Sequence, residues 1–335
     1  MTRGRLLWPL VALIALLVLN IAVEPSFVEL RIQDGHLFGS LVDILRNGAP
    51  TLLIAVGMTL VIATRGIDLS VGAVAAIAGA IACTYISGGG HAATAILLAL
   101  SVCVLLGLWN GFLVSVLGIQ PIIATLVLMT AGRGGAMLLT EGQIITVKDP
   151  LYRQIGSGFL VLPIAILISL AVLTAVALIT RRTALGMLIE AVGINPRAGE
   201  LAGVRSRTII WTVYVFAGLC AGVAGLMISS NVNAADANNA GLWIEMDAIL
   251  AVVIGGTSLA GGRYSLAGTM LGALVIQTLT TTVYTIGVPT NVTLVFKAVV
   301  VIVVCLLQSP RTAKMLRARR KTAAPTPRSQ EVAAG

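Results

Sequence analysis

Long runs of apolar residues alternate with short polar segments along nearly the whole chain. Several of these runs reach about 17–25 residues, the length that an α-helix needs to cross the hydrocarbon core of a bilayer. The pattern therefore predicts an all-α, polytopic membrane protein with about ten transmembrane helices. The expected spans are residues 6–23, 48–64, 70–87, 93–114, 121–140, 159–180, 208–230, 247–259, 265–286 and 292–308.

One polar interruption, residues 181–207, carries too many charged residues to lie inside the membrane. Within it, Asn195 can cap the start of a helix, Pro196 fits the first helical position, and Gly203 can end the helix in the left-handed conformation. The expected helix has about two turns, and a helix this short is not stable alone in water. It therefore either docks on another protein or forms part of a solvated linker.

The spacing of three and four residues places Ala198, Leu201 and Ala202 on one face of this short helix. Under the docking hypothesis, these side chains form a small apolar ridge that inserts into a partner protein. A charge at Leu201 should then interfere with docking while leaving membrane insertion intact.

Lys and Arg are distributed unevenly between the two sides of the predicted membrane body. If the N-terminus is cytoplasmic, the same side holds the segment 181–207 and the C-terminal tail, and it carries most of the 22 basic residues. The opposite side holds only Arg31, Arg46, Lys148 and Arg153. This asymmetry agrees with the positive-inside rule and with an even number of spans, so both termini are expected in the cytoplasm.

Composition excludes several classes of function. The chain is 58% hydrophobic and 10% charged, and its net charge of +9 is explained by the positive-inside distribution without a nucleic-acid partner. The four cysteines lie in apolar runs without metal or redox spacing, so we expect them to pack as small apolar residues. No catalytic, metal-binding or phosphate-binding motif occurs. We therefore expect no enzyme activity, no cofactor and no metal, and any ATP that drives the protein must be bound by another chain.

Polar residues on or beside the spans are candidates for a transport pathway or its gate, namely Asp68, Ser70, Asn110 and Gln120. Asp68 lies in ATRGIDLSVG, where glycine and polar residues interrupt a helix, and interrupted backbone at membrane depth is tolerated where it lines a cavity or is buried in protein. The alternative is that Asp68 caps the third span. Asn110 and Gln120 can equally hydrogen-bond neighbouring helices instead of a hydroxylated solute.

Two basic residues, Arg133 and Lys297, fall inside predicted spans. Because an unpaired charge is costly in the membrane, each is expected to have a partner. We predict that Lys297 pairs with Asp247 near the outer edge of the membrane.

Several stretches of the sequence resemble the permease subunits of ribose-type ABC sugar importers. They are GMTLVIATRGIDLSVGAVAAIAG (57–79), LWNGFLVSVLGIQPIIATLVLMTAGRG (108–134), TALGMLIEAVGINPRAGELAGV (183–204) and DAILAVVIGGTSLAGGRYS (247–265). Within that family, IQDGHLFGS (32–40) and ADANNAGLW (235–243) are most similar to galactofuranose permeases. The resemblance covers nearly the whole chain apart from the first residues and the tail. Arg65 departs from it, since the family usually has a small residue before GIDLS.

The resemblance implies the fold of a type II ABC importer permease. It also implies import of a galactofuranose-like or ribose-like monosaccharide across a bacterial inner membrane by alternating access. The implied partners are an ATP-binding cassette ATPase subunit, a second permease subunit in a homo- or heterodimer, and a periplasmic sugar-binding protein. The coupling helix that docks on the ATPase then corresponds to residues 190–203. Its candidate coupling residues are Glu190, Gly193, Asn195, Pro196, Ala198, Leu201 and Gly203.

We expect a single permease domain over residues 1–314, with its coupling loop at 181–207. Residues 315–335 are expected to form a basic, disordered tail near anionic membrane lipid on the cytoplasmic side. The main alternative function is an ion-coupled secondary transporter. Such a carrier usually needs buried titratable groups near mid-membrane, and this sequence has few of them.

Overall fold

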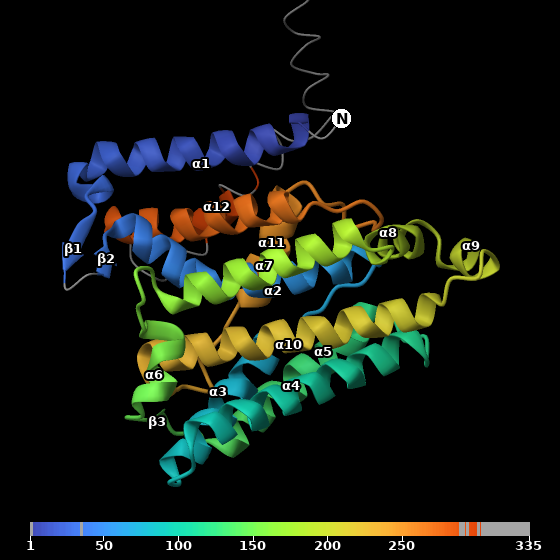
Figure 1. The fold of residues 1–335 in the computed structure, drawn as a ribbon, viewed down its shortest axis with the longest axis horizontal. Helices are drawn as coiled ribbons and strands as arrows, with labels where there is room; N and C mark the ends of the chain where they lie inside the picture. The colour runs from blue at the N-terminus through green and yellow to red at the C-terminus, as the bar shows by residue number, and fades with distance from the viewer. Residues whose placement is uncertain (1–2, 34–35, 288–291, 293–294, 300–301, 303–335) are drawn as a thin grey trace, which may run out of the picture.

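The computed structural model describes residues 3–33, 36–287, 292, 295–299 and 302 (Figure 1). Its α-helices are α1 (Arg3–Val23), α2 (Ser40–Ala63), α3 (Val71–Ser87), α4 (Ala92–Ser115), α5 (Pro121–Leu139), α6 (Pro150–Ser157), α7 (Ile164–Arg182), α8 (Leu185–Ile194), α9 (Pro196–Leu201), α10 (Ser206–Val232), α11 (Ile244–Ile254) and α12 (Leu266–Thr285). The other elements are the 3-10 helix η1 (Pro25–Val28) and the strands β1 (Arg31–Gln33), β2 (His36–Phe38), β3 (Ile145–Thr146) and β4 (Ala234–Ala235). β1 pairs with β2, and β3 pairs with β4, both antiparallel.

Each of the first nine predicted spans has a helical counterpart among the described residues. Seven of these helices are long and apolar enough to cross a membrane: α1, α2, α4, α5, α7, α10 and α12. The counterparts of the third and eighth spans, α3 and α11, are shorter, with 17 and 11 residues. The all-α, polytopic class is thus confirmed. Most of the tenth predicted span, 292–308, and all of the predicted tail, 315–335, lie outside the described residues.

Two helix boundaries differ clearly from the prediction. α2 begins well before residue 48, because its first turns contain Asp43 and Arg46 and so extend beyond the apolar run. α11 ends at Ile254 instead of residue 259, and the backbone then turns at Gly256, which has φ of +86°. Apolarity marks the part of a helix that lies in the membrane or against other helices, whereas hydrogen bonding continues until a residue such as glycine turns the chain.

The long helices lie side by side, and α10 packs against α2, α3 and α4 in the middle of the body (Figure 1). Glycines on α10 permit this close packing. A Cβ atom on Gly225 would collide with the carbonyl oxygen of Ala75 in α3. One on Gly218 would lie 2.6 Å from the carbonyl oxygen of Cys103 in α4. Small residues let helices approach closely in a membrane, where no hydrophobic force drives them together.

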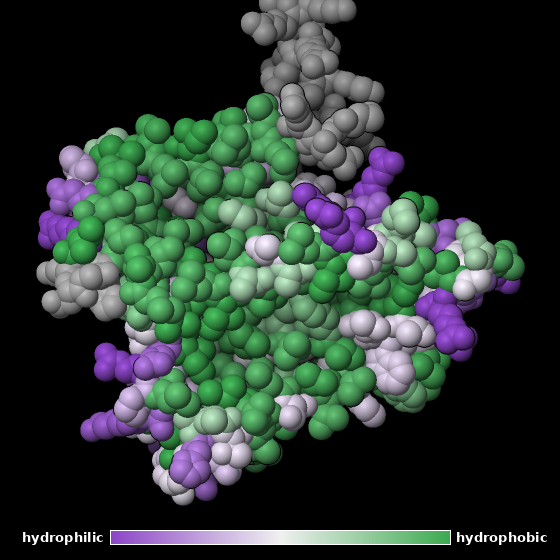
Figure 2. Space-filling view, in the orientation of Figure 1, coloured by the Kyte–Doolittle hydropathy of each residue, from purple (hydrophilic) through white to green (hydrophobic). Residues whose placement is uncertain are grey.

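The short elements gather at two opposite ends of the helical body. β1, β2, α6 and β3 lie at one end, and α8 and α9 lie at the other, on the same side as the start of α1 (Figure 1). Apolar side chains cover the body between these ends, and hydrophilic side chains concentrate near both of them (Figure 2). The segment 181–207 therefore lies beyond the apolar belt, as its charge predicted. α6 and α8 were not predicted, because with 8 and 10 residues they are shorter than the window over which an apolar period can be recognised.

Candidate functional site

The loop between α7 and α10 contains the two short helices α8 and α9, which project from one end of the body (Figure 1). The Oδ1 atom of Asn195 accepts hydrogen bonds from the backbone N–H groups of Arg197 and Ala198, each 3.1 Å long. Pro196 is the first residue of α9, and Gly203 beyond its end has φ of +84°. The cap, the start and the left-handed end of this helix are therefore as predicted.

One face of α9 is open to its surroundings. Leu201 is 88% exposed, and Ala198 and Ala202 are also exposed; we call these three side chains the α9 ridge. On another side, the hydroxyl of Ser206 donates a 3.0 Å hydrogen bond to the carbonyl oxygen of Pro196. This bond fastens α9 to the first residue of α10, so the ridge is presented on an anchored helix.

α8 anchors the same loop to the membrane helices. Ile189 and Val192 are buried. A Cβ atom on Gly193 would collide with the carbonyl oxygen of Ala63 at the end of α2, so only glycine permits this close approach. Glu190 is half-buried on the same helix. The backbones of α8 and of the end of α2 are therefore in direct contact.

Arg65 joins this loop to the break between α2 and α3. Its guanidinium group donates a hydrogen bond to the carbonyl oxygen of Ile194, the last residue of α8. That carbonyl has no partner within its own helix, because the last carbonyls of any helix lack one. Arg65 has φ of +65°, a left-handed conformation that favours glycine. The position where the chain departs from the permease pattern is therefore a contact to the candidate coupling segment.

A chain of buried polar side chains occupies the break itself. Asp68 is 2% exposed, and its Oδ1 atom accepts hydrogen bonds from the backbone N–H (2.9 Å) and the hydroxyl (2.6 Å) of Ser70. The amide of Asn110 in α4 donates a 2.9 Å hydrogen bond to the Ser70 hydroxyl. The cap position of α3 is occupied by Ser70 and not by Asp68. Asp68 lies two residues earlier, where its hydrogen bond from the backbone N–H of Ser70 closes the turn before the helix. Three of the four candidate pathway residues are thus in one hydrogen-bonded cluster.

Gln120, the fourth candidate, does not join this cluster. It is exposed at the start of α5, where its side chain makes no capping hydrogen bond. Thr125 of the same helix reaches the break instead. Its Oγ1 atom accepts a 3.1 Å hydrogen bond from the backbone N–H of Leu69 and lies 3.2 Å from the carbonyl oxygen of Ile67. Sequence reasoning missed Thr125, because a threonine within a helix commonly bonds only its own backbone.

Some hydrogen-bonding capacity near the break is unused. Among the described residues, neither Oδ1 of Asn110 nor the hydroxyl of Tyr214 has a hydrogen-bond partner. A Cβ atom on Gly66 would lie 2.5 Å from that hydroxyl, so glycine makes room for Tyr214 beside the break. Buried polar groups without partners cost about 1–3 kcal/mol each. Each of the two groups is therefore a candidate to bind a water molecule or a hydroxylated solute.

Polar contacts at the opposite end of the body involve the turn before α11. Arg133 of α5 donates hydrogen bonds to the carbonyl oxygens of Ala237 (3.1 Å) and Ala240 (2.6 Å). Backbone carbonyl groups are therefore the partners that this arginine was expected to have. In the same turn, the amide of Asn239 donates a 2.7 Å hydrogen bond to Oδ2 of Asp236. This hydrogen bond holds the pKa of the Asp236 carboxyl below its usual value.

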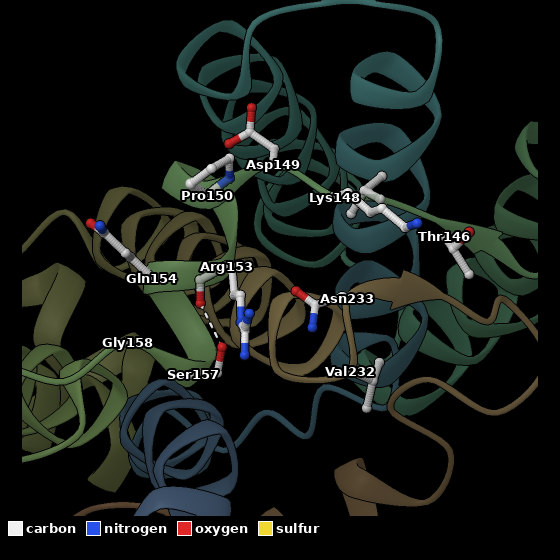
Figure 3. Close-up of a pocket in the computed structure, with 11 residues that line it drawn as sticks. Thr146, Lys148, Asp149, Pro150, Arg153, Gln154, Ser157, Gly158, Val232 and Asn233 are labelled. Atoms are coloured by element: carbon white, nitrogen blue, oxygen red, sulfur yellow. Dashed lines mark hydrogen bonds between the residues drawn. The ribbon is translucent and has the colours of Figure 1, made fainter. Parts of the chain in front are cut away.

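A cavity of about 720 Å³ opens at this end, between α6 and the end of α10 (Figure 3). Lys148, Arg153 and Asn233 are among its lining residues. Asp149 also lines it, but its Oδ1 accepts a 2.9 Å hydrogen bond from the backbone N–H of Tyr152 and so caps α6. The sequence did not point to this cavity. The described part of the chain contains no group of three or more His, Cys, Asp or Glu side chains that could hold a metal ion.

The structure thus combines a helical membrane body with a short anchored helix pair, α8 and α9, at one end. Residues 40–305 match the family described as branched-chain amino acid transport system / permease component. The chain therefore belongs to this permease family, and it is a transport subunit rather than an enzyme.

The relatives of the chain are permeases of sugar importers. It is 51% identical to the galactofuranose transporter permease protein YtfT of Escherichia coli (strain K12), over 96% of both chains. It is 43% identical to the fructose import permease protein FruF of Bifidobacterium longum (strain NCC 2705), over 92% of this chain and 88% of the relative.

The ribose import permease protein RbsC of Haemophilus influenzae (strain ATCC 51907 / DSM 11121 / KW20 / Rd) is 36% identical, over 88% of this chain and 90% of the relative. No solved structure matches the chain. These relatives confirm the resemblance to ribose-type ABC importer permeases, and none of them supports the ion-coupled alternative.

Proposed function

We propose that this chain translocates a galactofuranose-like or ribose-like monosaccharide across a bacterial inner membrane, as the permease subunit of an ABC importer. The observation that carries the proposal is the α9 ridge, an exposed apolar surface on a helix that is capped and anchored. The sequence has no phosphate-binding motif of its own. Energy from ATP must therefore enter through a contact with another protein, and the ridge is suited to that contact.

The contacts beneath the ridge supply a route from an ATPase subunit to the membrane helices. Closure of the ATPase subunits around ATP displaces α9 and, with it, α8. The close contact between Gly193 and Ala63, and the hydrogen bond from Arg65 to Ile194, carry this displacement to the end of α2. There it reaches the break that holds Asp68. Two permease subunits, identical or different, then exchange an outward opening for an inward one.

The opposite end of the body faces the periplasm in this arrangement, and both termini lie in the cytoplasm. A sugar-binding protein delivers the solute there. The cavity lined by Lys148, Arg153 and Asn233 supports this role, because it offers polar and charged groups to a soluble partner at the end remote from α9. We assign residues 1–314 to one permease domain and the basic segment 315–335, which lies outside the described residues, to a separate tail.

Reconstitution in liposomes tests the proposal. We expect uptake of labelled galactofuranose or ribose only when the ATPase subunit, the sugar-binding protein and ATP are all present. Vesicles that contain the permease alone, with a proton or sodium gradient in place of ATP, are the control. Uptake driven by the ion gradient alone would show that the proposal is wrong.

A further inference from the structure

An apolar groove lies beside the candidate coupling loop, where α7, α8 and α10 meet. It encloses about 120 Å³ and is lined by residues of these helices and of α2, among them Leu60, Val176, Ile189, Ile209 and Phe216. Two threonines also line it. Both hydroxyls donate hydrogen bonds within their own helices. The hydroxyl of Thr180 bonds the carbonyl oxygen of Val176 at 2.8 Å, and that of Thr212 bonds the carbonyl oxygen of Thr208 at 2.9 Å. The groove therefore offers carbon atoms and no free polar group, so it suits a hydrocarbon chain better than a sugar.

The groove opens onto the apolar belt. Leu170, Leu178 and Ile179 of α7 are each about half exposed, and such side chains on a membrane permease face lipid. Figure 2 shows this apolar surface over α7 and α10, with hydrophilic side chains gathered where these helices meet α8 and α9. The groove thus lies at the depth where the acyl chains of a phospholipid join its headgroup.

Four arginines flank the groove at that level. Arg181 and Arg182 form the last turn of α7, directly after the lining residues Ile179 and Thr180. Arg205 and Arg207 stand at the start of α10, just before the lining residue Ile209. All four are exposed. Within the described part of the chain, none of the four has a salt bridge to a carboxylate. Their positive charge is therefore available to a ligand.

We propose that this groove and these arginines form a binding site for one anionic phospholipid of the leaflet beside α8. An acyl chain lies in the groove, and the arginines hold the phosphate group. Guanidinium groups suit phosphate because their N–H donors match its oxygens in pairs. Basic pockets between membrane helices on the cytoplasmic side bind anionic headgroups. A free phosphate ion would use the arginines but not the groove, whereas a phospholipid uses both.

Native mass spectrometry of the purified full-length chain tests the site. Phosphatidylglycerol and phosphatidylcholine with the same acyl chains are added in turn. We expect phosphatidylglycerol to be retained in preference. Arg181→Gln with Arg182→Gln, and separately Arg205→Gln with Arg207→Gln, should weaken retention by about fivefold for each arginine removed. Arg263→Gln is the matched control, because Arg263 is an exposed arginine in the loop that contacts the end of α2, outside the groove lining.

The groove is tested separately with a phosphatidylglycerol that carries a photoreactive group on its acyl chain. Cross-links should fall on α7 and α10. Thr212→Phe, which places a ring at the groove, should reduce them severalfold in protein that elutes as a single folded species. The inference is overturned by equal retention of phosphatidylcholine, by unchanged retention in both arginine pairs, or by cross-links confined to other helices.

The same variants distinguish lipid binding from docking of the ATPase subunit on this surface. If the arginine pairs lose the ATPase subunit but keep phosphatidylglycerol, the arginines belong to protein docking and the lipid site is wrong. Neither measurement uses sugar or ATP. Failure of the lipid site is therefore distinguishable from failure of the proposed transport function.

Discussion

The ammonium nitrogen of Lys297 lies 2.9 Å from Oδ2 of Asp247, and both side chains are largely buried, at 14% and 24% exposure. The pair connects the first turn of α11 with the segment 295–299. The sequence predicted this pairing, because a lysine within an apolar run needs a partner. The structure confirms it.

Removal of either partner should destabilise the protein by about 2 kcal/mol, because the remaining charge is left partly buried. Asp247→Ala and Lys297→Ala together should cost less than the sum of the two single changes. Thermal unfolding in detergent measures all four proteins of the double-mutant cycle. A coupling energy near zero would mean that the pair contributes nothing to stability.

Leu201→Asp places a charge on the α9 ridge. If the ridge is buried against the ATPase subunit, the unpaired charge should lower ATP-driven uptake by at least about tenfold. Membrane insertion and thermal stability should be unchanged, because the side chain is 88% exposed in the isolated chain. Co-purification with the ATPase subunit measures the loss directly. Leu259→Asp is the control, since Leu259 is also an exposed leucine and lies outside the ridge. Undiminished co-purification of Leu201→Asp would exclude the ridge as the docking surface.

Two substitutions of Arg65 test the effect of its hydrogen bond to α8 separately from the effect of its left-handed backbone conformation. Arg65→Gly removes the bond to Ile194 but suits the left-handed backbone, so stability should change by less than about 1 kcal/mol. Arg65→Ala removes the bond and keeps the strain, so it should be less stable than Arg65→Gly. Both should reduce sugar uptake per ATP hydrolysed. An unchanged ratio of sugar uptake to ATP hydrolysis in Arg65→Gly would mean that this contact does not transmit movement.

Substitutions of Asp68 separate its charge from its hydrogen bonds. Asp68→Ala leaves the N–H of Ser70 without its acceptor in a buried place, at a cost of about 2 kcal/mol. Asp68→Asn keeps an oxygen acceptor at the same position, so folding and uptake should both be retained. Circular dichroism and uptake assays follow the two properties in parallel. If Asp68→Asn folds normally but does not transport, the carboxylate charge itself is required.

The turn before α11 should respond to acid through Asp236. The hydrogen bond from Asn239 lowers the pKa of Asp236 in the folded protein below its ordinary value of 3.8. The turn is therefore stabilised above that ordinary value, and the stabilisation is lost as the pH falls through the folded pKa. Proteolysis within this turn should stay slow from neutral pH to about pH 4 and accelerate below it. Asp236→Asn should remove this pH dependence, and an unchanged profile in that variant would assign it to another group.

Much of the fold could be predicted from the sequence, because its determinants are local. Apolar runs located a helix for each of the first nine predicted spans, seven of them long enough to cross a membrane, and basic residues marked the end of the body that holds α8 and α9. Asn195, Pro196 and Gly203 predicted α9, since a cap, a first-turn proline and a left-handed glycine each act within one helical turn. Lys297 and Asp247 could be paired because an apolar run leaves a charge few partners.

Only the tertiary structure decided which distant residues meet. Asn20 donates a buried 2.7 Å hydrogen bond to Thr282, at a sequence separation of 262. Arg65 reaches Ile194 across a separation of 129. Neither pair has a local signal, because hydrogen bonds between remote segments exist only after the helices have packed around α10. The same holds for α8, whose position depends on the contact of Gly193 with the end of α2. A cap acts through its nearest neighbours, whereas these contacts depend on the geometry of the whole bundle.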